Sequence, residues 1–210
     1  MMKSFFLGGG LAVVSLLTGC GLQDALHTAD VYNALNAAQV LTGPASDAAE
    51  IELRRGEATY TGLGTVTASN GSSVTAFLGD ASIRVDFTAG TVDGQIAMYS
   101  GKGGLDPNTD PQAFFDQVEA DPATFLLSMG SASGTVALTD GSFVGVGFVA
   151  SASSGDLVYD GTTVVVTGGT VTGEFTGADV NGVRSTATDV TGTVNGTGAS
   201  GIAVYFAGAE

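Results

Sequence analysis

Residues 82–96 read SIRVDFTAGTVDGQI, and this stretch decides the fold. Apolar residues alternate with polar ones from Ile83 to Phe87, and the alternation resumes from Val92 to Ile96. A period of two places successive side chains on opposite faces of an extended chain, so each half is a strand with one apolar face. Ala89-Gly90 separates the halves and supplies the glycine that a tight turn favours. The stretch therefore predicts a β-hairpin.

The same period recurs from residue 57 to the end of the sequence, between pairs of residues that favour tight turns. These pairs are Asn70-Gly71, Asp140-Gly141, Gly168-Gly169, Asn181-Gly182 and Asn195-Gly196. Successive hairpins give an antiparallel meander, and closure into a barrel removes its exposed edges. We predict an all-β fold: a single soluble antiparallel eight-stranded meander β-barrel over residues 57–210. The side chains expected inside are Ile83, Val85, Phe87, Val144, Val146, Phe148, Val171, Phe175, Val204 and Phe206.

Residues 100–130 interrupt the two-residue period. Asp110-Pro111 and Asp121-Pro122 each have the pattern of an N-cap followed by a first helical residue, which predicts a short helical insertion of two helices. Their apolar residues either pack the helices on the barrel or form an exposed patch for a partner, and both interpretations stay open. The candidate binding residues are Phe114, Phe115 and Phe125.

The N-terminal residues have the layout of a secretory signal. Lys3 supplies a positive charge, and the apolar run that follows is about 13 residues long, shorter than the roughly 20 that span a membrane. Small residues at Thr18 and Gly19 then precede Cys20, the only cysteine. We predict a lipoprotein signal peptide at 1–19, followed at 20–56 by a lipidated N-terminus and a tether with a possible short helix.

The sequence L-T-G-C that ends at Cys20 resembles the lipobox of bacterial lipoproteins. The resemblance implies that cleavage makes Cys20 the N-terminus and that its sulfur carries a diacylglycerol. In such lipoproteins an Asp directly after the cysteine favours retention in the inner membrane, and this sequence has Gly21 at that position. The resemblance therefore implies a lipid anchor in the bacterial outer membrane and allows exposure at the cell surface. The alternative is an ordinary signal peptide with a chance cysteine.

Charge and residue inventory exclude several functions. The sequence has a net charge of −15, which disfavours nucleic acid as a partner because phosphate binding needs clustered Lys and Arg. His27, the only histidine, lies in the predicted tether, so the barrel lacks a His- or Cys-based catalytic machine, zinc site or haem site. We therefore expect no metal, no cofactor and no enzyme activity. A carboxylate pair that hydrolyses a glycoside is the enzymatic alternative.

The predicted barrel is better suited to water than to a lipid bilayer. An outer-membrane barrel needs an apolar outer band flanked by aromatic girdles. The sequence has no Trp and five Tyr, and the predicted lipid anchor would already hold the chain at a membrane. We favour a soluble barrel over a membrane-spanning one.

Three segments resemble the transferrin-binding-protein-B-like surface lipoproteins of bacteria. They are ATYTGLG at 58–64, the opening stretch at 82–96, and GEFTGADVNGVRSTATDVTGTV at 173–194. The resemblance implies an eight-stranded soluble barrel displayed on a lipid anchor. This sequence has room for one barrel and for no handle domain. We therefore expect a surface binding module for a protein or small nutrient, with a structural envelope lipoprotein as the alternative.

Overall fold

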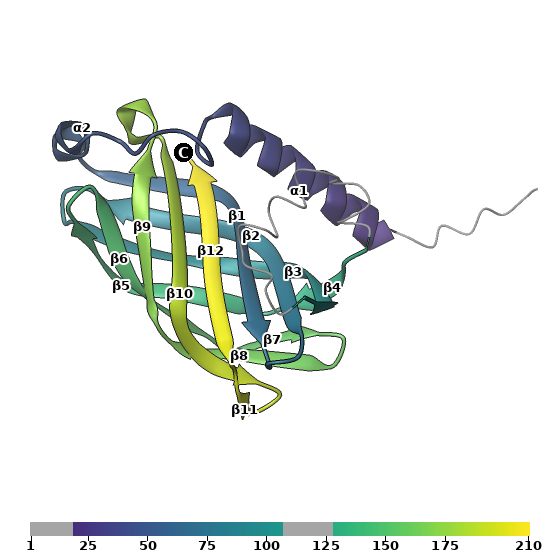
Figure 1. Ribbon diagram of the computed structural model, residues 1–210. Coiled ribbons are helices and arrows are strands. Elements are labelled where there is room, and N and C mark those ends of the chain that lie inside the picture. Colours follow the sequence, from purple (N-terminus) through teal and green to yellow (C-terminus); the bar gives the residue numbers. More distant parts are fainter. Residues whose placement is uncertain (1–18, 107–127) are drawn as a thin grey trace, which may run out of the picture.

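The computed structural model describes residues 19–106 and 128–210 (Figure 1). Two helices, α1 at Gly19–Ala37 and α2 at Ala48–Leu53, precede the strands. The first strands are β1 at Glu57–Ser69, β2 at Val74–Asp86, β3 at Thr91–Leu105, β4 at Gly130–Ser133, β5 at Thr135–Val144 and β6 at Gly147–Ser154. They are followed by β7 at Asp156–Tyr159, β8 at Thr162–Gly168, β9 at Thr170–Thr176, the 3-10 turn η1 at Ala178–Val180, β10 at Gly182–Val194, β11 at Thr197–Gly198 and β12 at Gly201–Ala209.

Several of these strands are segments of longer strands that are interrupted at a glycine. Segments β4 and β5 flank Gly134 and both pair with β3. Segments β6 and β7 flank Gly155, and together they run between β4–β5 on one side and β8–β9 on the other. Segments β8 and β9 flank Gly169 and both pair with β10. The φ angles of Gly134 and Gly169, 118° and 144°, explain why glycine stands at two of these kinks.

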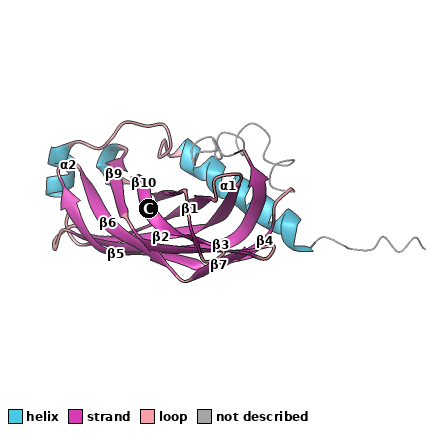
Figure 2. Ribbon diagram, turned by 60° about the horizontal axis from the view of Figure 1, so that its bottom comes forward, coloured by secondary structure: helices cyan, strands magenta, loops and turns pink. Residues whose placement is uncertain are grey.

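Counted in this way, and with the two-residue β11 set aside, the described residues form an eight-stranded antiparallel meander in which each strand pairs with the next along the chain. The last strand, β12, pairs with both β10 and β1, so the hydrogen-bonded ring returns to its start. Figure 2 shows the strands curving around a common interior. The predicted all-β meander is confirmed.

Eight of the ten side chains expected inside the barrel are buried, and two are not. Val144 is 58% exposed and Val146 is 41% exposed. Val146 lies in the turn between β5 and β6, whereas the exposure of Val144 has its cause at Asp140-Gly141, which the sequence predicted as a hairpin turn and which instead forms a bulge inside β5. The bulge shifts the register by one residue, so Phe143 packs on the core and Val144 points outward.

Gly168-Gly169 is a second wrong turn prediction, because β8 and β9 lie end to end beside β10 and do not pair with each other. The predicted turn at Asn195-Gly196 is confirmed. Both residues have positive φ, 52° and 75°, and the turn joins β10 to β11. The pair Ala89-Gly90 likewise lies in the turn between β2 and β3.

The segment expected to be a tether is a packed part of the fold. Helix α1 lies across the outer face of β12, β1 and β2 (Figure 1), where Tyr32 and Leu35 pack against Leu63 and Tyr205. No helix within the described residues is long and apolar enough to cross a membrane.

Helix α2 begins at an N-cap, Asp47, whose side chain accepts a hydrogen bond from the Ala49 amide at 2.9 Å. The Glu50 side chain accepts in turn from the Asp47 amide at 3.0 Å, which completes a capping box. This local signal fixes where α2 starts beside the barrel.

The predicted insertion is shorter in the structure than in the sequence analysis. Strand β3 continues to Leu105 and strand β4 starts at Gly130, so residues 100–105 belong to the barrel. The predicted helices at 107–127 lie outside the described residues.

Candidate functional site

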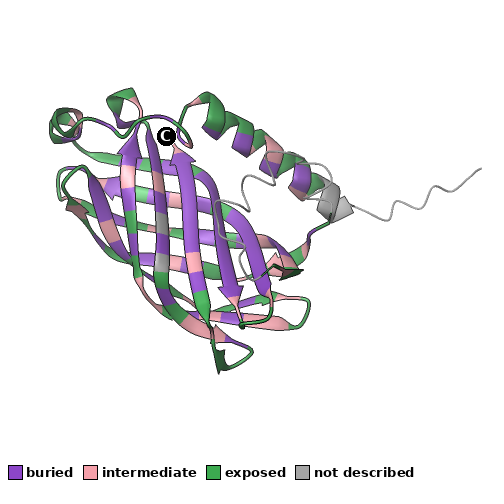
Figure 3. Cartoon of the chain, viewed as in Figure 1, coloured by how far each residue is buried: buried purple, intermediate pink, exposed green. Residues whose placement is uncertain are grey.

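The interior of the barrel is a packed core. Its largest side chains with less than 2% exposure are Tyr60, Phe77, Phe148, Phe175, Phe206, Ile83, Ile96 and Leu138. Phe175 lies at the centre of an aromatic cluster, with ring centroids 5.3 Å from Phe143 and 5.8 Å from Phe148. Figure 3 shows long buried stretches on β12, β1 and β2, whereas buried and exposed positions alternate along much of β3 and β5. Because side chains fill the core, a binding site is better sought at the two ends of the barrel.

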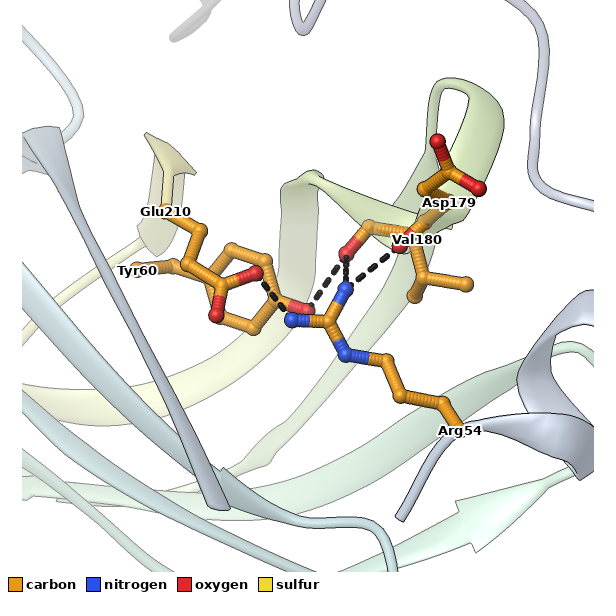
Figure 4. Close-up of polar contacts among 5 residues, drawn as sticks. All are labelled: Arg54, Tyr60, Asp179, Val180 and Glu210. Atoms are coloured by element: carbon orange, nitrogen blue, oxygen red, sulfur yellow. Dashed lines mark hydrogen bonds and ion pairs between the residues drawn. The ribbon is translucent and has the colours of Figure 1, made fainter. Parts of the chain in front are cut away.

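One end of the barrel, here called the α2 end, is closed by Arg54 (Figure 4). The guanidinium donates hydrogen bonds to the carbonyl oxygens of Asp179 at 2.5 Å and Val180 at 2.6 Å, and it forms an ion pair with Glu210. It also lies 4.9 Å from the centre of the Phe87 ring, which is within cation–π range. Arg54 therefore links α2, the η1 turn and the end of the chain over the core.

The Val180 carbonyl accepts a second hydrogen bond, from the Tyr60 hydroxyl at 2.7 Å. Burial raises the pKa of Tyr60 far above its usual value, an effect that the nearby Arg54 charge partly offsets. Val180 itself has a φ of 58°, which is unusual and strained for a β-branched residue. Two donors on one carbonyl hold this strained turn in place over the core, which keeps the α2 end closed.

The opposite end, here called the mouth end, carries a cavity of about 280 Å³. The cavity, called the mouth below, is lined by Asn70, Ser73, Thr75, Gly103, Gly104, Tyr159, Asp160, Thr162, Val194 and Asn195. These residues come from the β1–β2 turn, the start of β2, the end of β3, the β7–β8 turn with the strand ends beside it, and the end of β10 with the turn that follows. Thr75 and Val194 are buried, whereas Asn70, Asp160 and Asn195 are exposed, so the mouth has a closed floor and an open rim.

Tyr159 is the aromatic side chain of the mouth, and glycines make room for its ring. A Cβ added at Gly101 would lie 2.6 Å from Tyr159 Cδ2, and one added at Gly130 would lie 3.0 Å from Cε2. A Cβ at Gly103 would lie 3.5 Å from the same ring. The ring therefore rests on the bare backbone of β3 and β4, which limits its movement.

Hydrogen bonds fix the two asparagine turns of the rim. The Asn70 side-chain oxygen accepts bonds from the backbone amides of Ser72 and Ser73, each at 3.1 Å. The Asn195 side-chain oxygen accepts from the Thr163 amide at 2.8 Å, and its own backbone amide donates to the Thr163 carbonyl at 2.7 Å. Each side chain keeps its NH₂ group as the donor that it can offer a ligand.

Helix α1 brings polar contacts to the outer wall of the barrel. His27 Nε2 lies 2.7 Å from Asp80 Oδ1, and the hydroxyls of Thr28 and Tyr99 lie 2.6 Å apart. Burial raises the pKa of the Tyr99 hydroxyl, and its hydrogen bond with Thr28 opposes that shift. These contacts fix α1 to β2 and β3 and leave the mouth uncovered by the helix.

The sequence-predicted site residues are placed as follows. Phe114, Phe115 and Phe125 lie outside the described residues, so their binding role stays a prediction. Cys20 lies in the first turn of α1, and its lipidation also stays a prediction. Within residues 19–106 and 128–210, no cluster of three or more His, Cys, Asp or Glu side chains is arranged to hold a metal ion.

The sequence analysis missed the mouth, because its residues are scattered between positions 70 and 195. The available signal was the position of the turns: in a meander, alternate turns gather at one end. Assigning Asn70-Gly71, Asp160-Gly161 and Asn195-Gly196 to the same end would have brought them together.

No protein-family model matches the sequence, and no curated protein matches it. Solved structures of transferrin binding protein B do align with the chain. The isotype 1 protein from serogroup B Neisseria meningitidis is 14% identical with a TM-score of 0.42, over 79% of this chain and 27% of that protein. A double mutant of the protein from Haemophilus parasuis Hp5 is 15% identical with a TM-score of 0.40, over 80% of this chain and 28% of that protein. The chain thus spans less than a third of these structures, and the proposals below rest on its own geometry.

Proposed function

We propose that this chain is an outer-membrane-anchored lipoprotein that acts as a binding module for a protein or small nutrient, and that the ligand enters at the mouth. The mouth is the observation that carries the proposal. In the described part of the chain, buried aromatic and aliphatic side chains fill the core, and Arg54 closes the α2 end. The mouth end, in contrast, combines a concave shape with exposed polar side chains.

In this proposal the lipid anchor is attached at Cys20, the only cysteine, which follows a signal-like segment. The net charge of −15 gives the chain little attraction for nucleic acid or for anionic lipid, so a lipid on Cys20 would supply the membrane attachment. Exposure at the cell surface belongs to the same proposal.

A structural envelope lipoprotein without a soluble ligand is the second candidate. The filled interior supports it, because a barrel that holds no ligand inside has the packing of a spacer or scaffold. The two candidates differ in whether the mouth contacts another molecule in the cell.

A photo-cross-linking side chain placed at Ser73 in the living cell tests this difference. Ser73 lines the mouth, and the matched control is the same side chain at Val146, which is 41% exposed in a turn at the α2 end. We expect adducts at position 73 and not at position 146. Adducts at neither position would favour the structural candidate, and adducts at position 146 alone would move the site to the α2 end.

A further inference from the structure

The side chains around the mouth restrict the chemistry of its ligand. Among the described residues that line it there is one carboxylate, Asp160, and no Lys or Arg. An anionic ligand would meet a carboxylate and no compensating positive charge, in a chain that is already strongly acidic. Phosphates, carboxylates and sulfated groups are therefore poor candidates.

A purely cationic ligand is a poor match as well. An ammonium group only donates hydrogen bonds, and it could use Asp160 and the Tyr159 ring. It would leave the NH₂ groups of Asn70 and Asn195 without acceptors. Because an ammonium group offers these amides no acceptor, the rim is better matched by a ligand that both donates and accepts.

Tyr159 adds an aromatic side chain to this polar rim. Its ring is held against Gly101 and Gly130 and contributes to the lining of the mouth. A sugar ring has one face of C–H groups, which packs on an aromatic ring, and an edge of hydroxyls, which both donate and accept. Asp160 supplies an acceptor, the two asparagines supply donors, and the hydroxyls of Ser73, Thr75 and Thr162 can serve as either.

The size of the mouth limits how much of a ligand it holds. Its volume of about 280 Å³ is close to the lower end of the roughly 300–1,000 Å³ that small-molecule sites span. A single sugar ring fits this space, whereas a large nutrient such as a haem would overfill it. We propose that the mouth binds one neutral saccharide unit, with the pyranose ring on Tyr159 and its hydroxyls against Asp160 and the two asparagines.

This inference rests on the proposed function, and it names the ligand class for the same site. The saccharide could be free in solution or could be the exposed part of a glycolipid. Helix α1 bears on this question, because its first half packs near the mouth end, where Ala25 contacts Ala76 and Met129. A lipid on Cys20 would hold this end of the barrel close to the membrane surface, within reach of a sugar carried there.

Backbone amide chemical shifts of the full-length chain in detergent test the inference directly. The probes are glucose, galactose and N-acetylglucosamine, each added to about 10 mM, which detects dissociation constants into the millimolar range. We expect at least one of them to shift the amides of residues 70–75, 159–162 and 194–196. Asp160→Asn should weaken that binding about tenfold, because the amide replaces a charged acceptor.

Asp179→Asn is the matched control. Asp160 and Asp179 both have positive φ, 45° and 64°, which asparagine tolerates, but Asp179 lies at the α2 end. We expect Asp179→Asn to leave saccharide binding unchanged. Equal losses in both variants would mean that the effect is not local to the mouth, and that result would overturn the inference.

A vesicle experiment separates the two sources of the sugar. Phosphatidylethanolamine vesicles are prepared with and without a glycolipid that ends in the responding sugar. Tighter binding to the glycolipid vesicles than to the free sugar supports a membrane source, and equal binding supports a free one.

Failure of the inference is distinguishable from failure of the proposed function. Cross-links at Ser73 combined with no saccharide shift, or with preferential binding of an alkylammonium ion at the mouth, would overturn the saccharide assignment and leave a binding module. Absence of both cross-links and shifts would remove both proposals.

Discussion

Phe175→Ala removes the ring at the centre of the aromatic core, and the structure sets the expected cost. The side chain is fully buried, and its ring centroid lies 5.3–6.4 Å from those of Phe143, Phe87, Phe148 and Tyr60. Because four rings surround the site, the cavity would collapse poorly. We expect the free energy of unfolding to fall by about 3–5 kcal/mol, the range for buried Phe→Ala substitutions.

This loss is large beside the roughly 5–15 kcal/mol that stabilises a typical domain. Urea unfolding followed by circular dichroism measures it, and the midpoint should fall with the slope nearly unchanged. Val144→Ala is the control, because the sequence pattern places both side chains inside but the structure exposes 58% of Val144. We expect that control to change stability by no more than about 0.5 kcal/mol. A loss below about 1 kcal/mol at Phe175, or a larger loss at Val144, would refute the register described for the barrel.

Three further predictions concern the α2 end and the N-terminus. Arg54→Ala should lower the free energy of unfolding by about 2 kcal/mol, because two turn carbonyls lose a charged donor; Arg54→Lys should recover only part of this, since lysine lacks the planar fork. Urea midpoints measure both, and an unchanged midpoint for the alanine variant would contradict the closure of this end. Tyr60 has a raised pKa when folded, so its stabilising contribution should be complete below its unfolded pKa of about 10 and should be lost as the pH rises further. Tyr60→Phe should reduce the fall in stability between about pH 9 and pH 11, and an identical pH profile in both proteins would contradict the assignment. Mass spectrometry of the membrane fraction should find a diacylated N-terminal Cys20, and Cys20→Ser should release a chain that unfolds at the same midpoint; an unmodified cysteine would remove the anchor.

Sequence periodicity was enough to predict the meander, because a barrel strand with one buried face imposes a period of two on its residues. Ile83, Val85 and Phe87 are buried as the pattern requires, and so are Val204 and Phe206. The pattern failed where the backbone departs from regular pairing. The bulge at Asp140-Gly141 inverts the register after it, and a dipeptide of this type is equally suited to a turn and to a bulge.

The packing of the N-terminal helix on the outer wall was missed for a different reason, although a possible short helix was expected in this segment. Its contacts join residues that are far apart in the sequence, such as Leu35 with Leu63 and Tyr205. Buried apolar residues on the outer faces of β1 and β12 were the available signal, because a wall exposed to water would carry polar residues there. The mouth was missed in the same way, since Asn70, Tyr159 and Asn195 meet only when the barrel closes.

The location of ligand-induced amide shifts tests the central claim most directly. The isotope-labelled full-length chain would be mixed with a detergent extract of the envelope of the cells that produce it, and the changes would be mapped on the barrel. The account predicts shifts confined to the mouth, at residues 70–75, 159–162 and 194–196, with Arg54, Val180 and Phe175 unaffected. Shifts centred on Arg54 and Val180, or on the core around Phe175, would contradict it.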